Sequence, residues 1–360
     1  MELERILFIN LDRIGDTVRS TFLIRALRKN YPRAYLAVLA ASPSDQILER
    51  DPHVDEVFSM PHRQIRESMD NRETILQMSF PVFSLFEELR SHSFDLVINP
   101  FSEFGAMTVR YIKPRYMLGR AVNTKGEFVI YGRETAAFFY CMTNTHGTRS
   151  ANQLNFNDLY ARIVKDIGIS IEQKEMYPCL YPAPSDQAEA EDFFCSQGVQ
   201  PDAVCIGFQI GAYVKQKMWP VHKFRSIAEM LQKEYGAKII LTGSPHEAQT
   251  IIKEMIGPMK IKPAVAAGRM SIMGSAALIS RCDCFISNDT GPMHIAASLG
   301  IPVIALFGLV RTIPEESYPW GEQNTVLVQP AIEDIPVEAV CEAVRKRMDS
   351  LLARSQQGGE

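Results

Sequence analysis

The chain has 360 residues, of which 46% are hydrophobic, and its formal net charge is −4. A chain of this length is longer than a domain with a single hydrophobic core usually is, and it is typical of two domains. The hydrophobic content is that of a globular protein. The negative charge excludes a dominant basic field, so we expect no nucleic-acid partner.

Seven cysteines are scattered along the sequence and form no C-x-x-C pair. We interpret them as reduced thiols, because zinc-site spacing is absent and the chain is too large for a disulfide framework. No secretory signal precedes the first strand-like run, and no apolar run approaches the roughly 20 residues of a membrane span. We therefore expect a cytoplasmic protein.

Strands and helices alternate in the first hundred residues. An apolar run at residues 5–10 predicts a strand, and residues 15–32 follow with apolar positions on one helical face and basic positions on the other. Further strands are expected at residues 34–40, 54–60 and 94–100, with a helix at residues 84–92. This alternation predicts a parallel sheet with helices on both faces.

The middle of the chain is less regular. Between residues 105 and 149, basic residues are interleaved with aromatic residues, and a helical pattern follows at residues 155–168. Residues 176–187 contain three prolines and are the best linker candidate. We accordingly expect domains at residues 1–178 and 179–330, followed by a C-terminal segment at residues 331–360.

The second half repeats the alternating pattern. Strands are expected at residues 203–211, 237–244, 284–287 and 303–307, with helices at residues 220–236, 245–256, 271–281 and 335–354. The fold class is therefore α/β, with two doubly wound halves. Ligands of such sheets bind at the carboxyl ends of the strands, so the βα loops are the places to look for a site.

The first βα loop, "NLDRIGD", contains an acid at position 16. It lacks G-x-G-x-x-G, and no G-x-x-x-x-G-K-[ST] occurs in the chain, which argues against NAD enzymes and P-loop NTPases. Asp16 has two interpretations, an N-cap for the following helix or a carboxylate that accepts a proton. From spacing alone the N-cap is favoured.

The stretch "SNDTGPMH" ends a strand and begins a helix. Asp289 stands at the strand end, Thr290 and Gly291 form a turn, and Pro292 is expected at the first helical position. Amide N–H groups at such a helix start favour an anion, and His294 lies within the first turn. No D-x-D motif occurs, so a divalent metal that holds a diphosphate is not indicated.

Two other βα loops carry charges. Lys215 and Lys217 precede a helix and suggest a diphosphate site, with a solvated basic loop as the alternative. Glu247 lies in the first turn of its helix, where a carboxylate is favoured in any case, although it is also placed to bind ribose hydroxyls. We expect Trp219 to anchor the start of its helix rather than to stack on a base.

Four stretches, in order along the chain, resemble glycosyltransferase family 9, the heptosyltransferases of lipopolysaccharide assembly. They are "ILFINLDRIGDTVRSTFLIRALRKNYP", "KMWP", "TGSPHE" and "SNDTGPMHIAASLGIPVIALFG". The resemblance is weak between about residues 42 and 200. It implies a GT-B fold, with two Rossmann-like doubly wound domains facing a central cleft. The first domain would bind the acceptor, the second would bind the nucleotide sugar, and the final helix would cross back to the first domain.

The resemblance also implies roles for individual residues. Asp16 matches the general base of the family, which reverses the preference for the N-cap interpretation. The residues implied in nucleotide-sugar binding are Lys217, Glu247, Met270, Asp289, Thr290, Gly291 and His294. Asp12 and Arg13 depart from the family pattern, so that Asp12 either shares the role of Asp16 or pairs with Arg13.

The function implied by the resemblance is an inverting, metal-independent transfer without a cofactor. The sugar would be heptose from ADP-heptose, and the acceptor a lipopolysaccharide core or a related cell-surface glycan, which suggests a peripheral contact with the cytoplasmic face of the inner membrane. Four basic residues are candidates for binding acidic acceptor groups, with a solvated face as the alternative: Arg110, Lys113, Arg115 and Arg120. A nucleotide-sugar epimerase and a non-catalytic nucleotide-sugar-binding protein remain as other functions.

Overall fold

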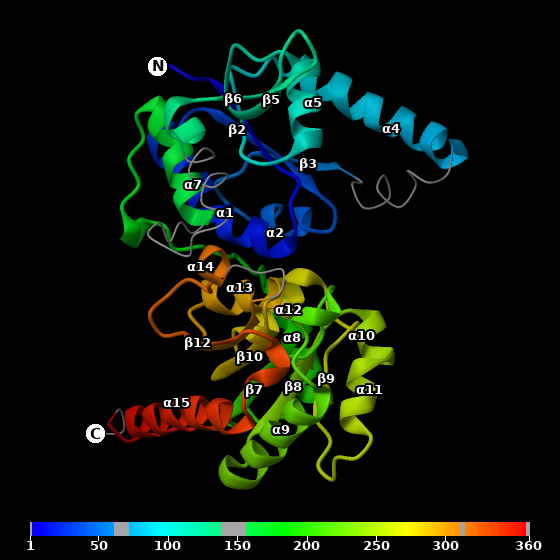
Figure 1. The fold of residues 1–360 in the computed structure, drawn as a ribbon, viewed down its shortest axis with the longest axis vertical. Coiled ribbons are helices and arrows are strands. Elements are labelled where there is room, and N and C mark those ends of the chain that lie inside the picture. Colours follow the sequence, from blue (N-terminus) through cyan, green and yellow to red (C-terminus); the bar gives the residue numbers. More distant parts are fainter. Residues whose placement is uncertain (1, 61–71, 138–155, 310–313, 358–360) are drawn as a thin grey trace. The chain divides into compact units, whose positions relative to one another are not determined.

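The computed structural model describes residues 2–60, 72–137, 156–309 and 314–357. The chain forms two compact units, Met1–Tyr181 and Pro182–Glu360 (Figure 1). Each unit is built around a six-stranded, mainly parallel sheet with helices on its faces. The predicted fold class, two Rossmann-like doubly wound α/β domains, is confirmed.

The sheet of the first unit has the strand order β3-β2-β1-β4-β5-β6. Its first five strands are parallel, and β6 pairs with β5 in the antiparallel direction. The strands are β1 (Arg5–Asn10), β2 (Tyr35–Ala41), β3 (Glu56–Met60), β4 (Leu96–Asn99), β5 (Tyr116–Val122) and β6 (Phe128–Tyr131). The β5–β6 hairpin lies in the segment for which the sequence predicted no regular element.

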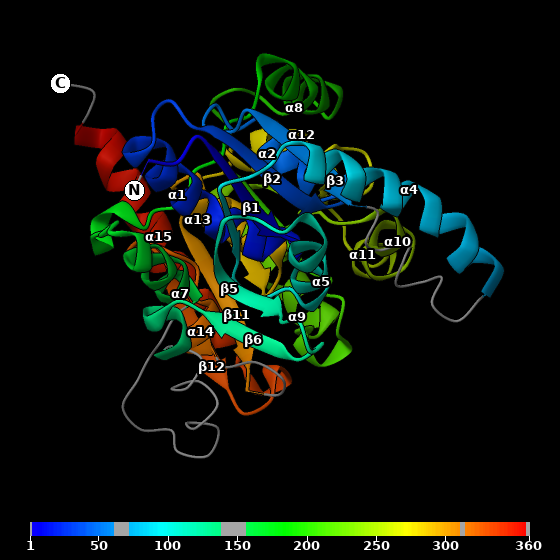
Figure 2. The same ribbon diagram turned by 90° about the horizontal axis from the view of Figure 1, so that it is seen from above.

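Helices cover both faces of this sheet, which is why its central strands are continuous apolar runs. They are α1 (Ile14–Asn30), α2 (Asp45–Leu48), α4 (Arg72–Ser91), α5 (Glu103–Ile112) and α7 (Phe156–Ile163). Leu7 and Ile9 of β1 belong to the core cluster that includes residues of α4 and α5, and these helices lie side by side (Figure 1 and Figure 2). Phe8 points to the other face, where its ring meets Tyr160 of α7.

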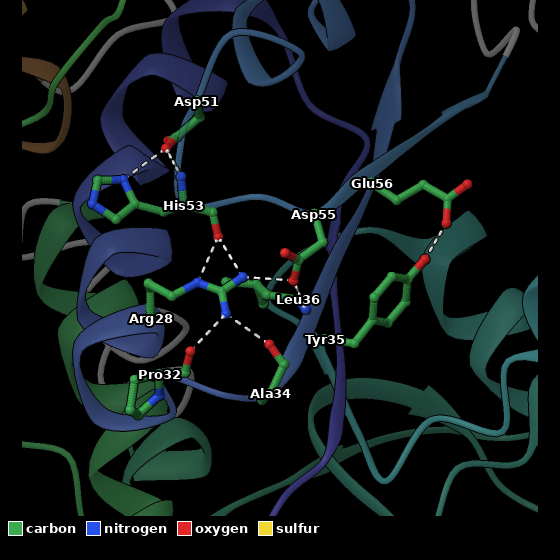
Figure 3. Close-up of polar contacts among 9 residues, drawn as sticks. All are labelled: Arg28, Pro32, Ala34, Tyr35, Leu36, Asp51, His53, Asp55 and Glu56. Atoms are coloured by element: carbon green, nitrogen blue, oxygen red, sulfur yellow. Dashed lines mark hydrogen bonds and ion pairs between the residues drawn. The ribbon is translucent and has the colours of Figure 1, made fainter.

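The end of α1 is fixed at the amino ends of the strands. The guanidinium of Arg28 donates to the carbonyl oxygens of Ala34 at 2.7 Å and His53 at 2.9 Å, and it pairs with Asp55 at 2.6 Å (Figure 3). Asp55 also accepts from the backbone N–H of Leu36 at 2.7 Å. Because α1 runs antiparallel to the strands, this anchor leaves the first turn of α1 at their carboxyl ends.

The sheet of the second unit has the order β12-β11-β10-β7-β8-β9, and all its strand pairs are parallel. The strands are β7 (Cys205–Gln209), β8 (Lys238–Thr242), β9 (Ala264–Val265), β10 (Cys284–Asn288), β11 (Val303–Gly308) and β12 (Thr325–Gln329). Strands β7, β8 and β10 are central to the site, because their carboxyl ends carry three of the loops singled out from the sequence.

The helices of the second unit are α8 (Pro184–Ser196), α9 (Val221–Tyr235), α10 (Pro245–Gln249), α11 (Ile251–Ile256), α12 (Ile272–Ile279), α13 (Gly291–Ser298), α14 (Pro314–Ser317) and α15 (Val337–Gln357). The single helix predicted over residues 245–256 is interrupted at Thr250, whose backbone is not helical. Helix α15 packs on α9 within this unit and buries Val340, Val344 and Met348 in the core. A crossing of α15 to the first domain remains a prediction.

None of the helices in the described ranges combines the length and the apolar character that crossing a bilayer requires.

Candidate active site

The β1–α1 loop is held to its helix by Asn10, a buried residue at the end of β1. Its Nδ2 donates to Ser20 Oγ at 2.7 Å, while its Oδ1 accepts from Thr17 Oγ1 and from the N–H of Asp12, both at 3.3 Å. One amide side chain thus ties the loop to the first two turns of α1. The sequence analysis did not identify Asn10, since nothing in its local spacing distinguishes it from other strand-end polar residues.

Asp16 is the third residue of α1 and not its cap. The helix begins at Ile14 and its N-cap is Arg13, whose side chain makes no capping bond. The N-cap interpretation of Asp16 is therefore wrong. Its Oδ1 accepts from Arg19 at 2.5 Å, and the Asp16 side chain is 38% exposed while that of Arg19 is 4% exposed. A buried guanidinium thus orients a carboxylate that solvent reaches.

Asp12 is a second carboxyl in the same loop. Its pKa is raised to about 7, first by burial and then by the charge of Asp16, against the opposing charges of Arg19 and Arg13. Tyr160 is buried close to these acids, and burial raises the pKa of its phenol well above the ordinary value. A group with a neutral pKa in such a loop is a candidate for proton transfer.

In the second unit, Lys217 and Asp289 form an ion pair. Lys217 ends a short 3₁₀ turn before α9, and Asp289 follows β10. The Asp289 side chain is 9% exposed, and its Oδ1 also accepts from Ser317 Oγ of α14 at 3.3 Å. The structure thus brings together two residues separated by 72 positions, both of which were predicted to lie at the nucleotide-sugar site.

Asn288 joins the loops that carry this ion pair. Its Oδ1 accepts from the N–H of Trp219 at 3.1 Å, and its Nδ2 donates to the carbonyl of Ile210 at 2.9 Å. Trp219 is fully buried and donates from its indole to the carbonyl of Ile335 at 3.0 Å. Trp219 therefore anchors the start of α9, as predicted, and fixes the backbone two residues after Lys217.

Glu247 lies against two glycines at the ends of β7 and β8. It accepts from Gln209 Nε2 at 3.2 Å and from the N–H of Ser244 at 2.6 Å, which completes a capping box on α10. A Cβ atom on Gly211 would lie 1.7 Å from Glu247 Oε1, and one on Gly243 would lie 2.9 Å from Oε2. The predicted first-turn role of Glu247 is confirmed, and its carboxylate is also fixed beside the glycine turn.

Met270 follows the loop after β9. In that loop the N–H of Gly268 donates to the carbonyl of Gly243 at 2.9 Å, which joins the loops that follow β8 and β9. Met270 is partly buried just before Ser271, the N-cap of α12. Met270 therefore lies close in sequence to Gly268, whose loop is hydrogen-bonded to the loop between β8 and the helix of Glu247.

The turn after β10 leads directly into α13. Thr290 is the N-cap and Gly291 the first helical residue, so Pro292 is second and not first as predicted. The Thr290 side chain makes no capping bond, and its hydroxyl donates to the carbonyl of Asn288 at 3.3 Å. His294 is buried in the first turn. N–H groups at such a helix start are suited to a ligand anion.

The model of glycosyltransferase family 9 (heptosyltransferase) matches residues 82–343. The chain belongs to this family. Lipopolysaccharide heptosyltransferase 3 of Escherichia coli is 25% identical over 297 residues, 82% of this chain and 80% of that protein. Lipopolysaccharide heptosyltransferase 2 of Salmonella typhimurium is 26% identical over 311 residues, 84% of this chain and 82% of that protein.

A crystal structure of a family 9 glycosyl transferase from Veillonella parvula matches this glycosyltransferase with a TM-score of 0.79 and 22% identity, over 97% of this chain and 99% of that one. At this identity the likeness shows the fold, which is the predicted GT-B type. The predictions of the family and of glycosyltransferase activity are confirmed by the family match.

The four basic residues predicted to bind the acceptor do not lie together in this glycosyltransferase. Lys113 and Arg115 lie in the turn between α5 and β5, at the amino end of β5. Arg120 lies near the carboxyl end of β5, where its Nη1 donates to the carbonyl of Phe101 at 3.1 Å. Because β5 is parallel to β4 and β4 to β1, Arg120 is at the strand ends that carry Asp16, whereas Lys113 and Arg115 are at the opposite ends.

Arg110 is exposed on α5, and its guanidinium approaches the β5–β6 turn, where a Cβ atom on Gly126 would lie 3.7 Å from Nη1. Arg149 and the aromatic residues at positions 138–140, which the sequence analysis grouped with these arginines, are outside the described residues. Within the described ranges, no three His, Cys, Asp or Glu side chains are placed to hold a metal ion.

Proposed function

We propose that this family 9 member is a heptosyltransferase that transfers heptose from ADP-heptose to an acceptor of the lipopolysaccharide core. The observation that carries the proposal is the Lys217–Asp289 pair beside the α13 turn, at the carboxyl ends of the second sheet. The relatives of similar sequence are lipopolysaccharide heptosyltransferases, which supports the pathway, and the similar fold of the ADP-heptose lipopolysaccharide heptosyltransferase II of Escherichia coli supports the donor. Transfer is inverting and requires no metal or cofactor.

The two units have separate tasks in this proposal. The second unit binds the nucleotide sugar, with the diphosphate at Lys217 and the α13 start, and with the ribose and base at Glu247 and Met270. The first unit binds the glycolipid or oligosaccharide acceptor. An acceptor of this kind is part of a membrane lipid, so the protein acts at the cytoplasmic face of the inner membrane.

Asp16 is the general base. It removes the proton of the acceptor hydroxyl while that oxygen attacks the anomeric carbon, and the bond from this carbon to the diphosphate oxygen breaks on the opposite face. Negative charge then grows on the leaving diphosphate. Lys217 and the N–H groups at the start of α13 stabilise this charge in the transition state.

Nucleotide binding tests the donor half of the proposal. Thermal unfolding is measured with ADP, UDP, GDP and CDP, each with EDTA and with Mg²⁺. A ligand at about 100 times its Kd stabilises the folded state by about 2.7 kcal/mol. Stabilisation by ADP alone, equal with EDTA and Mg²⁺, supports the proposal. Stabilisation by another nucleotide removes heptose as the favoured sugar, and no stabilisation removes the α13 turn as the donor site.

Product analysis tests the reaction itself. ADP-heptose is incubated with and without a heptose-deficient lipopolysaccharide core, and the products are identified by mass and by anomeric configuration. Acceptor-dependent transfer with inversion supports the proposal. An epimer or free sugar formed without acceptor assigns the chain to the epimerase class instead.

A further inference from the structure

The β1–α1 loop contains two carboxyls and one buried cation. Asp12 and Asp16 are four residues apart, and the guanidinium of Arg19 bonds to Asp16 at 2.5 Å. Arg13, the other nearby cation, has an exposed side chain and therefore acts through water-screened charge. In a partly buried site, two carboxylates with one close cation cannot both ionise readily, so one of them holds a proton near neutral pH.

The backbone around Asp12 is fixed on both sides. Its N–H donates to Asn10 Oδ1 and its carbonyl accepts from Ser44 Oγ, both at 3.3 Å. Among the described residues, no hydrogen bond to the Asp12 carboxyl is present, whereas the Asp16 carboxyl is bonded to Arg19. The backbone of Asp12 is thus fixed, while no described residue donates a hydrogen bond to its carboxyl that would fix the protonation state.

The charged and titratable groups around Asp12 come from three helices and the loop itself. Asp16 and Arg19 face it from α1, Arg13 from the loop and Tyr160 from α7. On α2, Asp45 is adjacent to Ser44, but its carboxylate accepts from Ser59 Oγ and from the N–H of Gln46. Of these groups, Asp16 raises the pKa of Asp12, in addition to burial, and the two arginines lower it.

We infer that Asp12 is a positioning residue for the proposed transfer, which takes over the proton that Asp16 removes from the acceptor hydroxyl. The inference rests on the proposed function. It explains why the loop combines an ion-paired carboxylate at the helix start with a second carboxyl to which no described residue donates a hydrogen bond.

The proton balance has three steps. The acceptor O–H bond breaks as the oxygen–carbon bond forms, and the proton moves to the Asp16 carboxylate. It then moves to ionised Asp12, which restores the Asp16 carboxylate and its bond to Arg19. After the products leave, Asp12 releases the proton to water. Asp12 must be ionised at the start of each cycle, so the rate is expected to rise with pH as Asp12 loses its proton.

The proton affinity of Asp12 is measured without any substrate. The full chain is labelled with ¹³C-aspartate, and its carboxyl resonances are followed from pH 4 to pH 9. One resonance should titrate near pH 7 and be absent from Asp12→Asn. Its midpoint should fall in Asp16→Asn, which loses a like charge, and rise in Arg13→Gln, which loses an opposite charge. A carboxyl resonance that still titrates near pH 7 in Asp12→Asn overturns the inference.

The relay is tested with the rate of transfer from ADP-heptose between pH 5.5 and 9. Below neutral pH the wild-type rate should fall about tenfold for each pH unit, as for one essential ionised base. This loss of rate at low pH should disappear in Asp12→Asn, and its midpoint should move to higher pH in Arg13→Gln. A purely structural role of Asp12 would lower the rate by the same factor at every pH, which overturns the relay and leaves the proposed function intact. A chain that transfers sugar from no nucleotide donor overturns the proposed function and the relay with it.

Discussion

The Nζ atom of Lys217 bonds to the carboxylate of Asp289, a side chain that is only 9% exposed. Ser317 donates to the other oxygen of the same carboxylate, and Asn288 bonds to the backbone before and after Lys217, at Ile210 and Trp219. A nearly buried carboxylate beside a diphosphate would repel it if Lys217 did not neutralise its charge. Under the proposed function, the pair both holds Lys217 beside the start of α13 and makes that turn tolerant of the donor diphosphate.

Replacing Lys217 tests this relationship. Lys217→Met should weaken ADP binding about 10- to 100-fold, because a charge-assisted hydrogen bond is lost and Asp289 is left as an uncompensated negative charge. Isothermal titration with ADP gives the affinity. Lys215→Met is the matched control, since Lys215 is exposed two residues earlier in the same turn. An equal loss in both variants would show that the charge of the loop, and not the ion pair, determines affinity.

Gly211 should tolerate no side chain without displacing Glu247. The added Cβ of Gly211→Ala would lie 1.7 Å from Glu247 Oε1, so the flexible carboxylate must move, which breaks the bond of this oxygen to Gln209 and disturbs the capping box with Ser244. We expect a stability loss of about 1 kcal/mol, as for a lost capping interaction, together with weaker ADP binding. Titration of Gly211→Ala, Glu247→Ala and the double variant measures the coupling.

The two single changes should not add, because each removes the same carboxylate from the same place. Gly257→Ala is the control, since a Cβ there would have only ordinary contacts, at 3.6 Å from the carbonyl of Lys253. Fully additive losses of ADP affinity would contradict a shared action through Glu247.

Asp16→Asn should lower kcat by 10²–10⁴-fold, the usual contribution of a general base, and leave ADP affinity unchanged. The reason is that Asn retains the size of the side chain but cannot take the proton. Steady-state rates with ADP-heptose and acceptor, together with ADP titration, separate the two effects. Arg19→Leu keeps the carboxylate and removes its partner, so we expect a smaller loss. If Arg19→Leu lost as much rate as Asp16→Asn, orientation of the loop would explain both results.

Arg120 and Arg115 should differ in their effect on acceptor use. Arg120 is near the carboxyl end of β5, whereas Arg115 precedes β5 at the opposite end of the sheet. Arg120→Gln should raise the acceptor KM about 10-fold, the value of one charge-assisted contact, while Arg115→Gln should leave it unchanged. Initial rates at varied acceptor concentration measure this. An equal rise in both variants would favour a diffuse basic surface.

Strands β1 to β4 of the first sheet and β7, β8, β10 and β11 of the second could be predicted, because a parallel strand covered on both faces is a continuous apolar run. Strands β5, β6, β9 and β12 were not predicted. The runs at residues 5–10 and 203–211, for example, correspond to β1 and β7. The N-cap of α1 was assigned to Asp16 because sequence rules look for a capping side chain, and this helix is capped by Arg13, whose side chain makes no capping bond. The loop is instead held by Asn10, a residue of the preceding strand.

The candidate donor residues could be found because they are in short motifs at strand ends. Their supporting contacts could not, since these join positions far apart in the chain. Asn288 bonds to Trp219 across 69 positions and to Ile210 across 78. Asp12 differs, because the charges that shift its pKa are close in sequence, but burial, the first cause of the shift, is set by the fold and could not be predicted from local spacing.

The raised pKa of Asp12 also predicts how stability depends on pH. The ordinary pKa of 3.8 applies in the unfolded chain, and the folded value is about 7. Between these values the folded state binds more protons, so the contribution of Asp12 becomes less favourable as pH rises from about 4 to about 7, and the full penalty applies above pH 7. Asp12→Asn removes the ionisation and with it the penalty.

Asp12→Asn should therefore be more stable than the wild type at pH 8, by on the order of 2 kcal/mol once the partial exposure of this carboxyl is taken into account. At pH 5 the gain should be much smaller, because folded Asp12 is then largely protonated. Thermal unfolding of both proteins at the two pH values measures the difference. Asp55→Asn, which loses an ion pair with Arg28, is the control and should be less stable than the wild type. An equal gain for Asp12→Asn at pH 5 and pH 8 would show that the Asp12 carboxyl is not the group that titrates near neutrality.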